Sequence, residues 1–194
     1  MEQISPLPAI KRYITSHNPI SGASVLLPED PLNWKSSKAK DTAACVAYTT
    51  TEFPPKLMDE QDLGKYKETM AGGKLGLVNP SGTVCRVVDF APGREAIMHS
   101  TKSLDYGVVL EGEVEMVLDS NERCTLHRGD IVIQRATMHG WRNSSSVKWA
   151  RMLFVLQECE DFVVGNHQVV ENLEATHGSF LYQNGDSNTS INEI

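Results

Sequence analysis

Two histidines and one aspartate, His99, Asp105 and His139, are the residues of this chain best suited to chemistry. A neutral imidazole binds a divalent metal ion or accepts a proton, depending on what lies beside it. A carboxylate close to an imidazole raises the pKa of the ring and orients it, or acts itself as a general base. These residue types therefore indicate metal binding or proton transfer, provided that the fold brings them together.

The elements around these residues are short β-type runs separated by turn signals. The expected strands cover residues 25–27, 44–48, 83–90, 106–118, 124–126, 131–134 and 147–157, and a short helix is expected over 56–70. Turns such as Ala91-Pro92-Gly93 and Asn143–Ser146 separate the strands. Strands and tight turns at this spacing predict an all-β sandwich or barrel.

One regular spacing links Gly93, His99, Asp105 and Gly112, and it resembles the first motif of the cupin superfamily. That motif runs glycine, five residues, His-x-His, three or four residues, glutamate, six residues and glycine. Gly93 and Gly112 stand at the two glycine positions, and His99 stands at the first histidine. Thr101 replaces the second histidine, and Asp105 replaces the glutamate.

A second cupin motif follows the first. Gly129-Asp130 supplies its turn, His139 its histidine, and Asn143 the asparagine four positions later. Residues 135–138 stand in place of the usual Pro-x-Gly stretch, with one residue fewer before the histidine. The chain thus resembles the cupin superfamily, and it is similar to single-domain Cupin_2-type proteins found in fungal secondary-metabolite clusters.

This resemblance implies a fold class and a division of the chain. The fold would be all-β, a single cupin barrel, also called a double-stranded β-helix or jelly roll, over residues 83–157. Residues 1–82 would form an N-terminal arm that packs on the barrel or on a partner subunit. Residues 158–194 would form a C-terminal extension with a short helical or irregular segment and a disordered tail.

The resemblance also implies a ligand set, because cupins generally hold a metal with three histidines and a glutamate. Here His99, Asp105 and His139 would form a 2-His-1-carboxylate set, the type that holds non-haem Fe(II). The expected cofactor is one divalent transition metal, Fe, Zn, Mn or Ni, and a metal-free catalytic pocket is the alternative. No nucleotide or organic cofactor is expected, since the sequence has no Gly-rich phosphate loop.

Six further residues are the predicted substrate contacts: Thr101, Tyr106, Trp141, Arg135, Met98 and Met116. Thr101 shares a strand face with His99. The aromatic residues would wall the cavity and the methionines would adapt to an apolar ligand, although both kinds also suit plain core packing. Arg135 would offer a fork to a substrate carboxylate, whereas the strand pattern favours a solvent-facing side chain.

Charge and composition exclude several kinds of partner. Eighteen Lys and Arg residues stand against 25 Asp and Glu residues, a net charge of −7 with no basic run, which argues against nucleic acid. No stretch reaches ~18 consecutive apolar residues and Met1–Pro8 does not resemble a signal peptide, so no membrane and a cytoplasmic location are expected. The four cysteines form no CxxC pair and are expected to be reduced.

The predicted function is the tailoring of a small, mostly apolar, oxygenated metabolite of polyketide type by lyase or isomerase chemistry: dehydration, decarboxylation or enolisation. His139 and Asp105 would move protons, while His99, with or without a metal, would polarise a carbonyl. The alternatives are an Fe(II)-dependent oxygenase and a non-catalytic barrel that binds a small molecule. A homodimer is expected, because strand-forming arms tend to pair across a two-fold axis.

Overall fold

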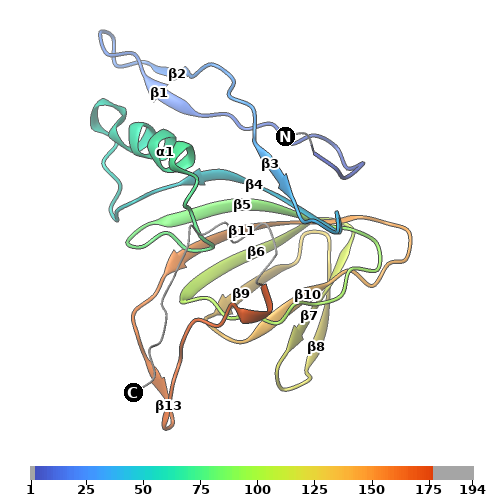
Figure 1. The fold of residues 1–194 in the computed structure, drawn as a ribbon. Coiled ribbons are helices and arrows are strands. Elements are labelled where there is room, and N and C mark those ends of the chain that lie inside the picture. Colours follow the sequence, from blue (N-terminus) through green and yellow to red (C-terminus); the bar gives the residue numbers. More distant parts are fainter. Residues whose placement is uncertain (1–2, 177–194) are drawn as a thin grey trace, which may run out of the picture.

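Two antiparallel β-sheets form the body of the protein, and residues from both sheets meet in its main hydrophobic core (Figure 1). The computed structural model describes residues 3–176. The larger sheet has the strand order β3-β4-β5-β11-β6-β9, and the smaller sheet has the order β10-β7-β8. The prediction of a mainly β fold is confirmed, and the one α-helix of the described residues lies in the region where a helix was predicted.

The strands follow the predicted segments closely in the barrel. The larger sheet consists of β3 (Trp34–Ser36), β4 (Thr42–Thr49), β5 (Thr83–Phe90), β11 (Ala150–Glu158), β6 (Ser103–Glu111) and β9 (Ile131–Arg135). The smaller sheet consists of β10 (His139–Arg142), β7 (Glu113–Leu118) and β8 (Arg123–His127). Outside them lie the hairpins β1 (Thr15–His17) with β2 (Ser24–Leu26) and β12 (Val163–Val164) with β13 (His167–Gln168). The helical segments are η1 (Met58–Glu60), α1 (Gln61–Gly72) and η2 (Glu174–Thr176).

Strand alternation separates two hydrophobic clusters on opposite faces of the larger sheet. In β5, Val88 and Phe90 belong to the main core, which also receives Trp141 from the smaller sheet. Val87, whose side chain points to the opposite face of the strand, belongs instead to a second cluster with Trp34 and other residues near the N-terminus. Because successive side chains of a strand point to opposite faces, β5 packs against the barrel interior on one side and the N-terminal segment on the other.

The N-terminal segment contributes strands to the barrel sheet itself. β4 pairs along its length with β5, from Thr42 opposite Phe90 to Thr49 opposite Val84. In Figure 1, α1 and the β1–β2 hairpin lie on one side of the larger sheet, and the smaller sheet lies on the other. Residues 1–82 therefore both extend the larger sheet and cover its outer face.

The helix predicted over residues 56–70 begins later than expected, at Gln61. Asp59 and Glu60 both have positive φ angles, 53° and 54°, which interrupt the helical backbone just before it. Gly73, with φ of 67°, ends the helix in the left-handed conformation that glycine adopts without a Cβ clash.

The chain leaves the barrel after β11 and returns to it. Ser100 and Asn172 form an isolated antiparallel bridge, and Leu173 packs against the main core. The predicted disordered tail falls on residues 177–194, outside the described residues. Within the described range, no helix is long and apolar enough to cross a membrane.

Candidate functional site

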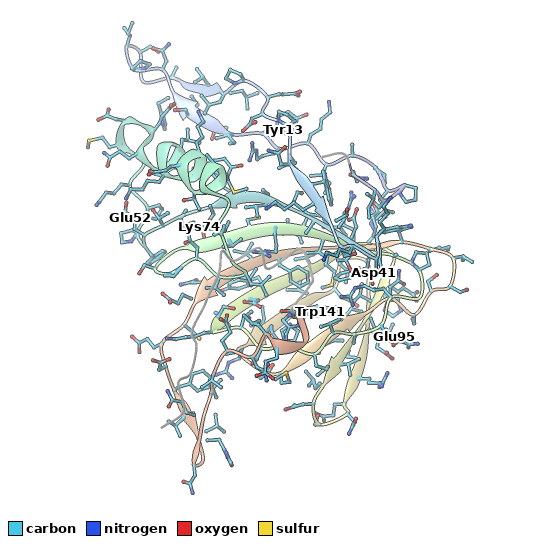
Figure 2. The ribbon with its side chains drawn as sticks, in the orientation of Figure 1. Tyr13, Asp41, Glu52, Lys74, Glu95 and Trp141 are labelled. Carbon is cyan, nitrogen blue, oxygen red and sulfur yellow. The ribbon has the colours of Figure 1, made fainter. Side chains whose placement is uncertain are left out.

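A cavity of about 320 Å³ is lined by side chains from both sheets. Its apolar wall includes Phe90 from β5, Phe154 and Leu156 from β11, and Trp141 from β10. Trp141, labelled in Figure 2, is only 7% exposed and lies in the interior. A volume of this size is near the lower end of the range, about 300–1,000 Å³, that is typical of small-molecule sites.

His99 and His139 lie next to each other in the wall of this cavity. Each backbone N–H donates a hydrogen bond to the other residue's carbonyl oxygen, at 2.8 and 2.9 Å, which fixes the two segments side by side. Their ring centroids are 4.4 Å apart. The structure therefore brings together the two histidines that the sequence motifs selected.

Backbone hydrogen bonds define the same tautomer for both rings. His99 Nδ1 lies 2.9 Å from the Ile97 carbonyl oxygen, and His139 Nδ1 lies 2.9 Å from the Thr137 carbonyl oxygen. Because a carbonyl only accepts, His99 Nδ1 carries the hydrogen and donates it. Gln134 Nε2 also lies 2.9 Å from His139 Nδ1, but its two N–H groups have acceptors in the Thr137 carbonyl and hydroxyl oxygens, so His139 Nδ1 is assigned as a donor to Thr137 in the same way. The Nε2 lone pair of each ring is thereby left as the available nitrogen.

Burial keeps both imidazoles neutral. It lowers the pKa of His139 to about 4, with a further contribution from the neighbouring His99, and it also lowers the pKa of His99. At neutral pH both Nε2 atoms are therefore unprotonated. In this state the rings accept a hydrogen bond or a proton, or act as nitrogen ligands, but they do not donate a proton from Nε2.

Asp105 is buried in β6 and is stabilised by its own strand. Burial raises its pKa to about 6, while the hydrogen bond from Ser103 and the positive charge of Arg86 act in the opposite direction. Ser103 Oγ donates to Asp105 Oδ1 at 2.5 Å and lies 2.8 Å from Thr101 Oγ1. Asp105 thus titrates close to neutral pH within the same cavity wall.

The predicted three-ligand set is not assembled. In the described part of the chain, no three His, Cys, Asp or Glu side chains are grouped so that they could hold a metal ion. No hydrogen bond joins Asp105 to either imidazole among these residues. Aspartate is one methylene shorter than the glutamate of the motif, and Asp105 is held by Ser103. The donor set fits a metal only through the two imidazoles and falls short of the 2-His-1-carboxylate centre.

The predicted substrate contacts divide into two groups. Thr101 and Trp141 line the cavity. Tyr106 does not, because it follows Asp105 in β6 and therefore points to the opposite face, where it is 43% exposed. Arg135, at the end of β9, is also exposed and outside the cavity.

The two methionines predicted as ligand contacts also lie outside the cavity wall. Met116 packs against the main hydrophobic core, and Met98 is partly buried. Met116 therefore follows the alternative of core packing that the sequence left open. A flexible methionine therefore does not line this site.

Two arginines that the sequence did not select do line the cavity: Arg86 and Arg94. Arg86 stands between Val84 and Val88 in the inward phase of β5, and its Nη2 donates to the carbonyl oxygens of Gly76 and Leu77. Arg94 follows Gly93 in the loop after β5. The sequence contained a signal for Arg86, because a charged residue stands there among strand positions that are otherwise apolar. The sequence contained no such signal for Arg94.

Comparison with known proteins supports the assignment of the motifs. The Cupin domain (Cupin_2) family model matches residues 86–156. "Phomopsin biosynthesis cluster protein D" of Diaporthe leptostromiformis is 43% identical over 152 residues, covering 77% of this chain and 78% of that protein. "Cupin-domain-containing oxidoreductase fogC" of Aspergillus ruber is 38% identical over 169 residues, covering 86% of this chain and 81% of that protein.

Solved structures also match, over a smaller part of the chain. The Cupin_2 domain of an XRE family transcriptional regulator from Enterobacter cloacae is 26% identical, with a TM-score of 0.35, covering 40% of this chain and 83% of that one. The family assignment rests on the sequence relatives, which extend over most of both chains. The chain belongs to the cupin family and resembles the cupin proteins of fungal secondary-metabolite clusters.

Proposed function

We propose that this protein is an oxidoreductase of fungal secondary metabolism that acts on a small, mostly apolar, oxygen-bearing metabolite. The observation that carries the proposal is the pair of neutral imidazoles, His99 and His139, in the wall of a largely apolar cavity. Relatives such as fogC, virC and srdB are named cupin-domain-containing oxidoreductases, which supports oxidoreduction over the lyase or isomerase chemistry expected first.

The side chains of the cavity suit three tasks in such a reaction. Phe90, Phe154 and Trp141 bind apolar parts of the substrate and exclude water. The two Nε2 atoms accept a hydrogen bond from a substrate hydroxyl group, and each takes up its proton if the reaction releases one. A divalent metal, if one binds, would have His99 and His139 as its nitrogen ligands.

Proton transfer without oxidoreduction is the second candidate function. Asp105 favours it, because a carboxyl group with a pKa of about 6 exchanges protons readily at neutral pH. This group would support the enolisation or dehydration of a carbonyl compound of the polyketide type. A homodimer and a cytoplasmic location remain predictions in either case.

Disruption of the coding gene in its native host distinguishes these candidates by the mass of the compound that accumulates. Under the proposal, this compound differs from the normal product by two hydrogen atoms or by one oxygen atom. A difference of water or carbon dioxide, or no difference in mass, would show lyase or isomerase chemistry and contradict the proposal.

Complementation then tests the residues. The wild-type gene restores the product, whereas His139→Ala does not, although the variant protein accumulates at the wild-type level. Arg135→Ala is the matched control, because Arg135 lies outside the cavity, and it restores the product fully. Full restoration by His139→Ala would separate the imidazole pair from the function.

A further inference from the structure

One end of the cavity carries two basic side chains and lies close to the loop that joins β3 to β4. This end is lined by Arg94 and Lys38 together with Asp41 and Thr42. Ala91 N donates to Asp41 O at 2.9 Å, so the loop after β5 packs against the loop before β4. Figure 2 shows Asp41 and Glu95, which belong to these two loops, at the same end of the barrel.

Arg94 is held firmly by neutral partners. Its Nε donates to Thr42 Oγ1 at 2.6 Å, and its Nη1 donates to the carbonyl oxygens of Trp141, at 3.2 Å, and Glu95. The guanidinium carbon lies 5.7 Å from the centre of the Phe90 ring. These contacts fix the orientation of the guanidinium group before any ligand binds.

No carboxylate of the described residues forms an ion pair with Arg94. Two other partly or fully buried arginines differ: Arg151 pairs with Asp89, and Arg12 pairs with Asp30. Burial lowers the pKa of Arg94, and Asp41 is the acidic residue that counteracts this shift. Asp41, however, accepts hydrogen bonds from the Ser37 and Thr42 hydroxyl groups.

One nitrogen of Arg94 is left for a ligand. Nη2 of Arg94 has no hydrogen-bond partner among residues 3–176. It is not fully buried, so a ligand is able to reach it. A positive charge without an ionic partner in a partly buried site favours an anion. The N–H groups of Nη2 are suited to donate charge-assisted hydrogen bonds to a carboxylate, whose negative charge complements the guanidinium group.

An apolar surface connects Arg94 with the imidazole pair. Trp141, whose carbonyl accepts from Arg94, has its ring centre 5.2 Å from that of His139 and 5.3 Å from that of Phe154. The charge of Arg94 also contributes to the lowered pKa of His99. A single small molecule is therefore able to contact the charged end, the aromatic wall and the imidazoles together.

We infer that the substrate of this cavity is an apolar molecule with a carboxylate group, and that Arg94 binds this carboxylate and determines specificity for it. This inference rests on the proposed function in one respect, namely that the cavity is the substrate site. The group opposite the carboxylate lies at His99 and His139. Arg94 thus takes the role that the sequence gave to Arg135, which lies outside the cavity.

Two fluorescent probes of nearly equal size test the inference: 1-naphthoate, which is an anion, and 1-naphthamide, which is neutral. Their dissociation constants are measured by fluorescence titration with the full-length protein. The wild-type protein binds naphthoate about 10- to 100-fold more tightly, as expected for charge-assisted hydrogen bonds. Arg94→Gln reduces this preference to near parity while its affinity for naphthamide is retained.

Two further variants separate binding from folding and from general electrostatics. Arg94→Lys keeps the charge but not the fixed position of the Nη2 donor, and it shows an intermediate preference. Arg142→Gln removes the same charge from a residue that pairs with Glu95 and Glu115 outside the cavity, and it keeps the wild-type preference. Because the preference is a ratio within each variant, a general loss of folded protein does not imitate the effect.

Several results would overturn the inference: equal affinities in the wild-type protein, no binding of either probe, an unchanged preference in Arg94→Gln, or the same loss in Arg142→Gln. These outcomes are independent of the proposed oxidoreduction. If the accumulated metabolite shows a change of two hydrogens or one oxygen while the probes bind equally, only the carboxylate specificity fails. If naphthoate is preferred but the metabolite differs by water or carbon dioxide, only the reaction type fails.

Discussion

Asp105 and His139 show opposite pKa shifts that have the same physical cause. Burial disfavours the charged form of each, so the pKa of the acid rises from 3.8 to about 6 and the pKa of the base falls from 6.5 to about 4. The contribution of Asp105 to stability is complete below pH 3.8 and is lost as the pH rises through 6. The contribution of His139 is complete above pH 6.5 and is lost as the pH falls through 4. The two contributions therefore oppose each other across the same pH range.

Asp105→Asn tests this balance, because asparagine keeps an acceptor for Ser103 and removes the buried charge. We expect the variant to be more stable than the wild-type protein at pH 8, by about 1–3 kcal/mol in the free energy of unfolding. The difference should vanish near pH 4, where the wild-type carboxyl group is protonated. Urea unfolding across this pH range measures it. Asp119→Asn, in the exposed turn after β7, is the control, and an equal gain there would contradict the explanation.

Five residues selected from the sequence line the cavity: His99, Thr101, Asp105, His139 and Trp141. The sequence did not reveal that Asp105 would form no hydrogen bond with either imidazole. The position of Asp105 relative to the histidines depends on how β6 packs against segments with which it forms no strand pairing. The role of Arg94 was equally hidden, since it depends on a contact with Thr42, 52 residues earlier in the chain.

At the scale of elements, Gly112 shows why a motif residue is needed for the turn between β6 and β7. Its φ angle is +73°, and a Cβ atom there would lie 2.9 Å from the Trp149 carbonyl oxygen and 3.1 Å from Ala150 Cα. Both contacts are with backbone atoms, which do not move aside as a flexible side chain would. Backbone conformation and close packing therefore both require glycine.

Gly112→Ala should consequently destabilise the protein by about 2–5 kcal/mol, the sum of left-handed strain and overpacking. Gly22 is a matched control, because its φ angle is nearly the same, +72°, and nothing lies within 4 Å of a Cβ there. Gly22→Ala should cost only about 1–2 kcal/mol. Chemical unfolding of the two variants gives the comparison, and equal losses would refute the packing argument.

Prediction of the elements succeeded where hydrophobic runs were long. β5 coincides with the predicted strand over 83–90, and the run over 106–118 became β6 and β7 with Gly112 between them. β3 and β10, with three and four residues, were not predicted. So short a strand has little periodicity of its own, and it forms because a neighbouring strand offers hydrogen-bonding partners.

At the scale of the whole molecule, a buried ion pair attaches the N-terminal segment to the outer face of the larger sheet. Arg151 Nε and Nη2 donate to Asp89 at 2.5 and 2.7 Å, and both side chains are almost fully buried. Arg151 Nη1 also donates to the Pro8 carbonyl oxygen at 2.6 Å, and Ser5 donates to Asp89. The Trp34 ring lies 5.3 Å from the guanidinium carbon. The Asp89–Arg151 pair of β5 and β11 thus contacts two parts of the N-terminal segment, the stretch with Ser5 and Pro8 and the strand residue Trp34.

Arg151→Met should therefore destabilise the whole protein by about 3–5 kcal/mol, because it leaves the Asp89 carboxylate buried without its partner. Adding Asp89→Leu removes the unpaired charge, and the double variant should recover at least about 2 kcal/mol of this loss. Arg123→Met, which breaks the exposed pair with Glu115, should cost less than about 1 kcal/mol. Urea unfolding at pH 7 provides all three values. If the double variant is no more stable than Arg151→Met, the attachment of the N-terminal segment depends on the lost contacts to Pro8 and Trp34 rather than on the buried charge.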